Sequence, residues 1–122
     1  MAVTTTTASN PLVPTIVVDA DADLTVEAVA SGNKTVYAVE ITNPNTADAV
    51  YLHIKEDTSA TQTSQHDHQL YCPANTTCYY YFPTGIETSS GIMMYASTTP
   101  GGGASAVAPE QAVTVTFGFT AR

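Results

Sequence analysis

Short segments in which apolar and polar residues alternate make up most of this chain, and this period of two predicts β-strands. In residues 35–43, Tyr37, Val39 and Ile41 share one side of an extended backbone, and we expect that side to face the core. The same alternation predicts Val50, Leu52 and Ile54 inward and Tyr51, His53 and Lys55 outward, and it places Val113, Val115, Phe117 and Phe119 on one face. Turn-forming residues such as Gly, Pro and Asn separate the segments. The expected strands are residues 15–18, 24–30, 35–43, 50–55, 69–72, 78–82, 92–97 and 112–119.

No longer stretch shows helical spacing, so the pattern predicts an all-β protein. Seven or eight short strands separated by turns are typical of an antiparallel β-sandwich, either immunoglobulin-like or jelly-roll. With 122 residues the chain can bury one core, and residues 15–122 are expected to form that single domain. Residues 1–14 are Thr-rich, contain Pro11 and Pro14 and show no periodicity, which predicts an extended N-terminal arm that needs a partner to order it.

Charged residues are scarce and mostly acidic. They make up 11% of the chain, against about 25% in ordinary globular proteins, and the net charge is −8. The basic residues are Lys34, Lys55 and Arg122, too few to neutralise a run of phosphates, so nucleic acid and anionic membrane surfaces are excluded as partners. There is no run of about 18 apolar residues and no basic, apolar leader, so we expect a protein made in the cytoplasm that spans no membrane.

The spacing Asp19-x-Asp21-x-Asp23 is similar to the start of a calcium-binding loop. Such a loop needs Gly at its sixth position and Glu at its twelfth, where this chain has Leu24 and Ala30. We therefore expect a solvated acidic turn that leads into a strand.

Three histidines, His53, His66 and His68, are the residues that zinc would need. The latter two lie in a polar loop without a second ligand pair at a standard spacing, so solvated histidines are expected. The chain also lacks a Gly-x-Ser-x-Gly elbow and a phosphate-binding glycine loop. The sequence therefore predicts no catalytic residue, no metal site and no cofactor, and hence a protein that is not an enzyme.

Cys72 and Cys78 flank a five-residue turn at the ends of two expected strands. In a regular hairpin they would face each other at a separation that a disulfide can span. A bridge and a pair of small buried thiols are both compatible with this spacing.

The run from Tyr79 to Phe82 is the densest aromatic cluster of the chain. Alternation sends Tyr79 and Tyr81 to one side and Tyr80 and Phe82 to the other, so one pair is expected to pack inward. The other pair would lie at a protein interface or stack on sugars, unless the strand is an ordinary half-buried one.

From Thr35 to Ser97 the chain resembles small structural proteins of tailed bacteriophages, in particular capsid decoration or cement proteins. The resemblance rests on Thr35-Val36-Tyr37, Ile41-Thr42-Asn43-Pro44, Val50-Tyr51-Leu52-His53-Ile54-Lys55, Cys72-Pro73-Ala74, Phe82-Pro83-Thr84-Gly85-Ile86 and Ser90-Gly91-Ile92. It implies a β-sandwich that assembles as a homo-oligomer, often a trimer, on the outer face of a capsid. Such proteins bridge neighbouring subunits of the major capsid protein.

Two functions follow as expectations. The first is a virion decoration protein that attaches through its N-terminal arm and one sheet edge. Its expected interface residues are Thr4, Thr5, Thr6, Thr7, Pro11, Leu12, Val13, Pro14 and Tyr80. The alternative is a fibre- or tail-type adhesion domain that holds a glycan with Tyr80 and the loops of residues 56–68 and 98–111.

Overall fold

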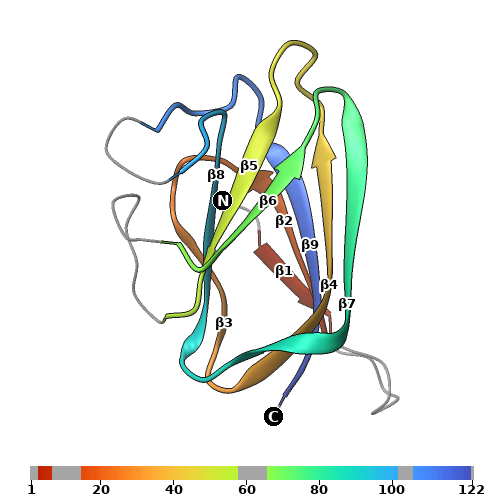
Figure 1. Ribbon diagram of the computed structural model, residues 1–122, viewed down its shortest axis with the longest axis vertical. Coiled ribbons are helices and arrows are strands. Elements are labelled where there is room, and N and C mark those ends of the chain that lie inside the picture. Colours follow the sequence, from red (N-terminus) through yellow and green to blue (C-terminus); the bar gives the residue numbers. More distant parts are fainter. Residues whose placement is uncertain (1–2, 7–14, 58–65, 102–105, 122) are drawn as a thin grey trace.

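The computed structural model describes residues 3–6, 15–57, 66–101 and 106–121, which form two antiparallel β-sheets packed face to face (Figure 1). The strands are β1 (Val3–Thr6), β2 (Thr15–Ala22), β3 (Glu27–Ser31), β4 (Lys34–Asn43), β5 (Val50–Lys55), β6 (His68–Cys72), β7 (Thr76–Thr88), β8 (Gly91–Ser97) and β9 (Val113–Ala121). One sheet has the order β1-β2-β9-β4-β7 and the other the order β3-β8-β5-β6. The all-β prediction and the two-layer antiparallel architecture are confirmed.

The described part of the chain contains no helix, and so none that would reach across a lipid bilayer. Eight of the nine strands coincide with the expected segments, and β1 is the additional one. The strands form because β-branched and aromatic residues alternate with polar ones, which suits a pleated surface with one buried side.

The core lies between the two sheets and is built from the inward side of each strand. In β9 the inward residues are Val113, Val115, Phe117 and Phe119, each at most 4% exposed. Opposite them, β5 contributes Val50, Leu52 and Ile54. The period of two in these segments therefore gave the correct buried side.

In β4 a bulge changes which residues face inward. The register against both β7 and β9 shifts between Val36 and Ala38, so that two residues of β4 oppose one residue of β9. Val36 and Val39 are both buried although they are three positions apart, whereas Tyr37 is 39% exposed. The expectation that Tyr37 faces the core is therefore wrong.

The long strand β7 continues to Thr88, whereas the expected strand ended at residue 82. Its residues 82–85 are an insertion opposite the bulge of β4, and beyond them β7 bends across the end of the sandwich towards β8 (Figure 1). Gly85 allows this bend because its φ is +78°, in the left-handed region. It also allows close packing, since an added Cβ would lie 2.2 Å from Cγ2 of Thr35 and 3.1 Å from Cε1 of Tyr37.

Part of the expected N-terminal arm belongs to the sheet. Strand β1 pairs antiparallel with β2, with Val3 opposite Asp19 and Thr6 opposite Ile16. Val3 also packs against the core. Because β2 supplies the backbone partner, these residues form an edge strand of the domain itself, whereas the sequence predicted an extended arm that a partner would have to order.

At one end of the sandwich two buried asparagines tie three connections together. Asn43 Nδ2 donates to the carbonyl oxygens of Asp48 and Pro73 at 3.0 and 3.1 Å, and its Oδ1 accepts from the backbone N–H of Asn45 at 3.0 Å. Asn45 in turn exchanges two hydrogen bonds with the backbone of Gln111, at 3.0 and 2.7 Å. These bonds satisfy polar groups that would otherwise be buried without a partner.

We expect Gly85→Ala to destabilise the protein by about 1–3 kcal/mol more than Gly32→Ala does, because overpacking adds to the cost of a left-handed backbone. Gly32 is a matched control, since its φ is also +78° but an added Cβ would meet no atom within 4 Å. Urea unfolding of both variants measures the difference. Equal losses of stability would contradict the close contact between Gly85 and Thr35.

Candidate functional site

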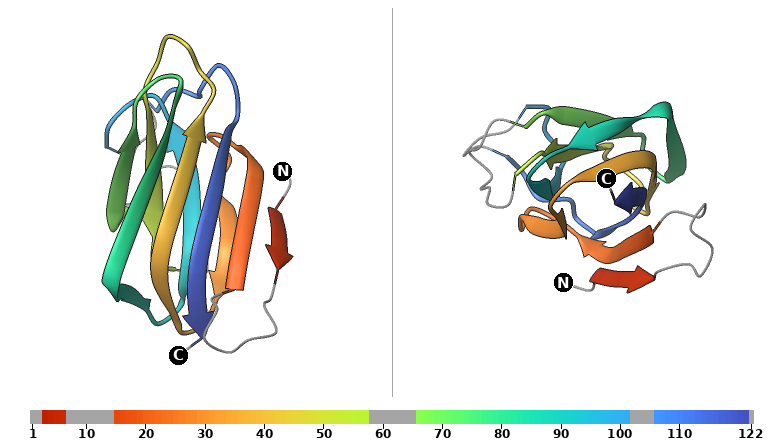
Figure 2. Two further views of the ribbon diagram at one scale, coloured as in Figure 1. Left: turned by 90° about the vertical axis from the view of Figure 1, so that its right-hand side faces the viewer. Right: turned by 90° about the horizontal axis from the view of Figure 1, so that it is seen from below.

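The outer face of the five-stranded sheet is broad and almost uncharged. Glu40 is the one charged side chain in the three rows of residues that are described next. Figure 2 shows the five strands side by side, with β7 and β1 at the two edges. The register places side chains of neighbouring strands in rows across this face. We call these rows the tyrosine face; they contain Thr42, Thr77 and Thr114, then Thr4, Val18, Thr116, Glu40 and Tyr79, then Ile16, Gly118, Ala38 and Tyr81.

A groove of about 180 Å³ runs across the tyrosine face. Its floor is low because Gly118, which has no side chain, lies opposite Ala38, which has only a methyl group. Ile16 of β2 forms one wall and Tyr81 of β7 the other, since these residues flank the small pair in the same row. The groove therefore follows from the sizes of the residues in one row.

The second row gives the groove its polar lining and a second aromatic ring. Glu40 is half-buried and lies opposite Thr116 on one side and Tyr79 on the other. Tyr79 and Tyr81 are 57% and 69% exposed, and their rings are parallel with centroids 6.3 Å apart. The groove thus combines one carboxylate with two accessible aromatic faces.

Tyr80, the expected interface tyrosine, points the other way. It is half-buried against the core, and its hydroxyl donates a hydrogen bond to the carbonyl oxygen of Tyr71 in β6. This bond connects the edge strands of the two sheets. The structure therefore presents Tyr79 and Tyr81, rather than Tyr80, on the exposed face.

The other expected interface residues are placed only in part. Thr4 is exposed on β1, and Thr5 and Thr6 continue that strand. The rest of the set lies outside the described residues: Thr7, Pro11, Leu12, Val13 and Pro14. Their contact with a partner stays a prediction.

His53 is buried on the outer side of the four-stranded sheet, where the sequence predicted an exposed residue. Only 1% of it is exposed, because its ring stacks on Tyr95 at 4.4 Å and His66 packs against it with ring centroids 4.9 Å apart. Its Nε2 lies 2.8 Å from Oγ of Ser97, and that Oγ is 2.8 Å from the carbonyl oxygen of Thr99.

These distances indicate which nitrogen and oxygen atoms of His53, His66 and Ser97 carry the protons. Ser97 has one hydroxyl proton, which the Thr99 carbonyl accepts, so Nε2 of His53 must carry a proton and donate it to Ser97. His53 Nδ1 is then the acceptor for Nδ1–H of His66, 3.4 Å away. A nucleophilic serine requires the opposite arrangement, in which the imidazole accepts the hydroxyl proton. This pair is therefore arranged as a structural hydrogen bond.

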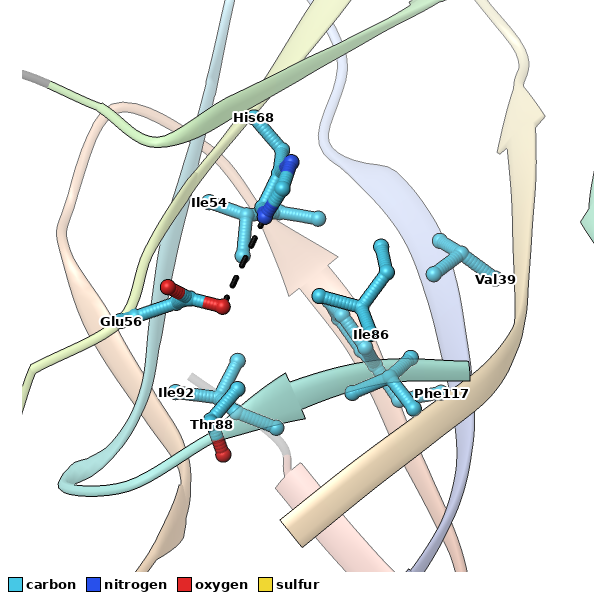
Figure 3. Close-up of a pocket in the computed structure, with 9 residues that line it drawn as sticks. Val39, Ile54, Glu56, His68, Ile86, Thr88, Ile92 and Phe117 are labelled. Carbon is cyan, nitrogen blue, oxygen red and sulfur yellow. Dashed lines mark ion pairs between the residues drawn. The ribbon is translucent and has the colours of Figure 1, made fainter. Parts of the chain in front are cut away.

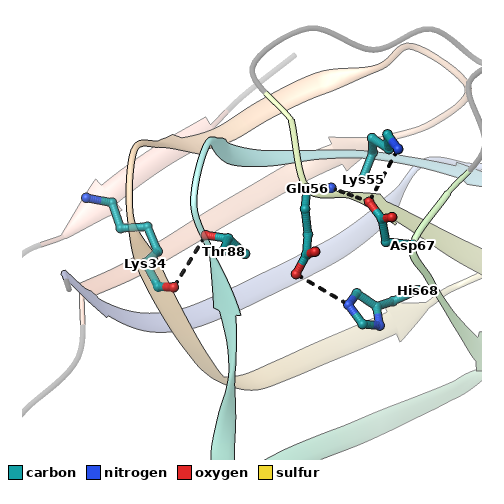
Figure 4. A network of polar contacts seen from close by, with 6 residues as sticks. All are labelled: Lys34, Lys55, Glu56, Asp67, His68 and Thr88. Atoms are coloured by element: carbon teal, nitrogen blue, oxygen red, sulfur yellow. Dashed lines mark hydrogen bonds and ion pairs between the residues drawn. The ribbon is translucent and has the colours of Figure 1, made fainter.

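His66 and His68 do not converge, although they are two residues apart. His68 Nε2 lies 3.6 Å from Oε1 of Glu56, while Asp67 accepts a hydrogen bond from the backbone N–H of Glu56 at 2.7 Å and lies 3.6 Å from Nζ of Lys55 (Figure 4). His66 turns towards His53 instead. Within the described ranges, no group of three His, Cys, Asp or Glu side chains is placed to hold a metal ion.

A small hollow lies between the two sheets, close to the bend of β7. Figure 3 shows Ile54, Glu56 and His68 on one side of it, and Ile86 and Phe117 on the other. Its volume of about 10 Å³ is close to that of one water probe. It is a gap in the core packing and is too small for a substrate.

The two cysteines are free thiols, one on each sheet. Cys72 ends β6 and Cys78 lies in β7, and these strands are not a hairpin, since the connection between them crosses from one sheet to the other. The sulfur of Cys72 is buried, 3.2 Å from the Thr76 carbonyl oxygen. Burial and the neighbouring Cys78 raise the pKa of Cys72 to about 12, so this thiol is not an activated nucleophile.

Asp19 is a buried carboxyl group in β2, where the sequence predicted a solvated acidic turn. It is 1% exposed, and Oδ1 accepts the backbone N–H of Asp21 at 2.9 Å. Its Oδ2 is buried and has no hydrogen-bond partner among the described residues. Burial, with smaller contributions from Glu27, Asp21 and Asp23, raises the pKa of Asp19 to about 6. The turn prediction is wrong here because β2 extends to Ala22.

Comparisons with protein-family models, with curated proteins and with solved structures gave no match. The candidate site is therefore described by its own geometry.

Most residues that line the groove could not be recognised from the sequence. Gly118 offered a signal, because a glycine inside a β-branched strand often marks close approach of a ligand or another chain. Glu40 gave none, since its place beside Tyr79 depends on the register of two distant segments.

We expect His53 to be neutral at pH 7, as the Nε2–H tautomer, and to gain a proton only near pH 4. Burial and the nearby His66 lower its pKa from 6.5 to about 4. Side-chain nitrogen shifts followed by NMR over a pH titration measure both properties. Protonation near pH 6.5 would contradict the burial of the ring between Tyr95 and His66, and an Nδ1–H tautomer would contradict the hydrogen bond that Nε2–H donates to Ser97.

Asp19 should make the protein less stable as the pH rises from about 4 to 6. Because its folded pKa of about 6 exceeds the ordinary value of 3.8, the folded state holds this proton more tightly, and the stability that the proton confers is lost through that window. Asp19→Asn should remove this loss and stabilise the protein at pH 7 by about 2 kcal/mol.

Urea unfolding at several pH values tests this expectation. Asp48→Asn is the matched control, since it removes the same charge from an exposed side chain. If the stabilities of the native protein and Asp19→Asn run parallel between pH 4 and 7, the buried carboxyl does not carry the effect.

Proposed function

We propose that this chain is a non-enzymatic structural protein that decorates the outside of a bacteriophage capsid and bridges subunits of the major capsid protein. In this proposal the protein is made in the host cytoplasm, forms a homo-oligomer, with a trimer favoured, and attaches through the tyrosine face. The observation that carries the proposal is the composition of that face. Its three rows are wide and uncharged apart from Glu40, and two tyrosines are exposed.

The strand order supports a jelly roll as the type of sandwich. The antiparallel pairs β2·β9, β3·β8, β4·β7 and β5·β6 are nested, as in one long ribbon that has been rolled up. In an immunoglobulin-like sandwich several consecutive strands pair with each other, whereas among the nine described strands only β1·β2 and β5·β6 do. Jelly rolls are common in viral capsid and lectin domains.

The face has the composition of a protein interface. Tyrosine is enriched in interfaces and charged residues are depleted at their centres. A net charge of −8 makes contact with packaged DNA unfavourable, which supports a position outside the shell. The free edge of β7 carries Pro83, which limits edge-to-edge pairing and favours attachment through the face.

Replacing Tyr79 and Tyr81 together with Ser should remove the protein from particles without unfolding it. Truncating central interface tyrosines costs about 2 kcal/mol or more, roughly a thirtyfold weaker Kd. Binding to purified particles that lack the protein measures this, and Tyr71→Ser is the control, since it truncates a 46% exposed tyrosine on the other sheet. Normal occupancy of the double variant would refute attachment through this face.

A glycan-binding adhesion domain is the second candidate, because lectin domains share the jelly roll and exposed tyrosines stack on sugars. A glycan array with the native protein separates the two functions. Binding to a defined glycan that the Tyr79 and Tyr81 variant loses, with no affinity for particles, would favour adhesion.

A further inference from the structure

We propose that the groove on the tyrosine face binds an arginine side chain from an extended segment of the partner protein. In the complex, Glu40 accepts hydrogen bonds from the guanidinium group, while Tyr79 and Tyr81 pack against its planar surface. This inference rests on the proposed function, since it names the partner chemistry that the face recognises.

Glu40 supplies the charge that such a partner would meet. It is half-buried at the groove and lies between Thr116 and Tyr79 in the register. Within residues 3–6, 15–57, 66–101 and 106–121, no basic side chain is within ion-pairing distance of it. An ionised carboxylate that is half-buried without a cation is poorly stabilised, because its surroundings are less polar than bulk water. A partner that places a cation beside it therefore lowers its free energy.

The two rings favour arginine over lysine. Tyr79 and Tyr81 are parallel, 6.3 Å apart and mostly exposed. A guanidinium is planar and weakly hydrated, so it stacks on aromatic rings while its edge donates to a carboxylate. An ammonium group is strongly hydrated and has no plane to stack.

The size and lining of the groove favour a side chain over a small-molecule ligand. Its volume of about 180 Å³ is below the roughly 300–1,000 Å³ of typical ligand pockets. Glu40 and Thr116 are the polar side chains other than the tyrosines that line it. A sugar ring needs several hydrogen-bonding groups, whereas a side chain with an apolar stem and one charged end needs few.

A foreign partner fits better than a second copy of this chain. The whole chain has three basic residues, and one of them, Lys55, already pairs with Asp67. A second copy could therefore bring few cations to this groove, whereas the net charge of −8 attracts a basic segment of another protein. Charge complementarity therefore identifies the occupant as a basic segment of another protein.

NMR titration with three short peptides tests the inference. The peptides are acetyl-Ala-Ala-Xaa-Ala-Ala amides in which Xaa is arginine, citrulline or lysine. Citrulline has nearly the shape of arginine without its charge. We expect the arginine peptide to shift the amide signals of Glu40, Tyr79 and Tyr81, with citrulline binding about tenfold more weakly and lysine in between.

Two variants and one control variant locate the binding site. Glu40→Gln should weaken the arginine peptide about tenfold, because it removes one charged hydrogen bond, and Glu110→Gln, the same change at an exposed site outside the groove, should have no effect. Ala38→Leu should abolish binding by filling the floor. Equal affinities for arginine and citrulline, no shifts with arginine, or shifts of the same residues only with methyl glucoside, would overturn the inference.

Particle binding keeps this inference separate from the proposed function. If Glu40→Gln attaches to particles normally while the Tyr79 and Tyr81 double variant does not, the arginine site is wrong and the decoration function stands. If the double variant attaches normally, attachment through the tyrosine face fails, whatever the peptides do.

Discussion

The register of β4 between β7 and β9 is the constraint on which the two faces of the larger sheet depend. Side chains alternate along a strand, so a shift of one residue exchanges the buried and exposed sets. The bulge between Val36 and Ala38 makes such a shift within one strand, against both neighbours. It keeps Val36 and Val39 in the core and turns Ala38 and Glu40 outward, where one forms the groove floor and the other meets Tyr79.

The strands could be predicted from sequence because their signal is local. A period of two and flanking turn residues located eight of nine strands, and the inward side of β5 and β9 was correct. The bulge could not be predicted, since nothing in the segment from Val36 to Ala38 shows which strand opposes it. The prediction that His53 is exposed was wrong for a related reason. Its side chain does point outward, but Tyr95 and His66 cover it from distant parts of the chain.

The outer sides of the two sheets differ in how their polar groups are satisfied. Over the smaller sheet, His53 is enclosed and hydrogen-bonded to Ser97 and His66. Over the larger sheet, Glu40 has no charged partner among the described residues. Enclosed and satisfied groups stabilise a fold, whereas a half-buried carboxylate without a cation gains from a partner that supplies one. This asymmetry supports the proposed attachment through the larger sheet.

The near absence of charge on the tyrosine face also determines what kind of contact it can make. In the proposed complex, two exposed tyrosines and Ile16 would provide affinity through buried apolar area, which salt affects little. A single carboxylate adds less to affinity than to discrimination, because a partner without a matching cation would leave Glu40 desolvated and unpaired. A face of this design would tolerate changes in ionic strength and still select its partner, which is what the proposed attachment to the outside of a particle requires.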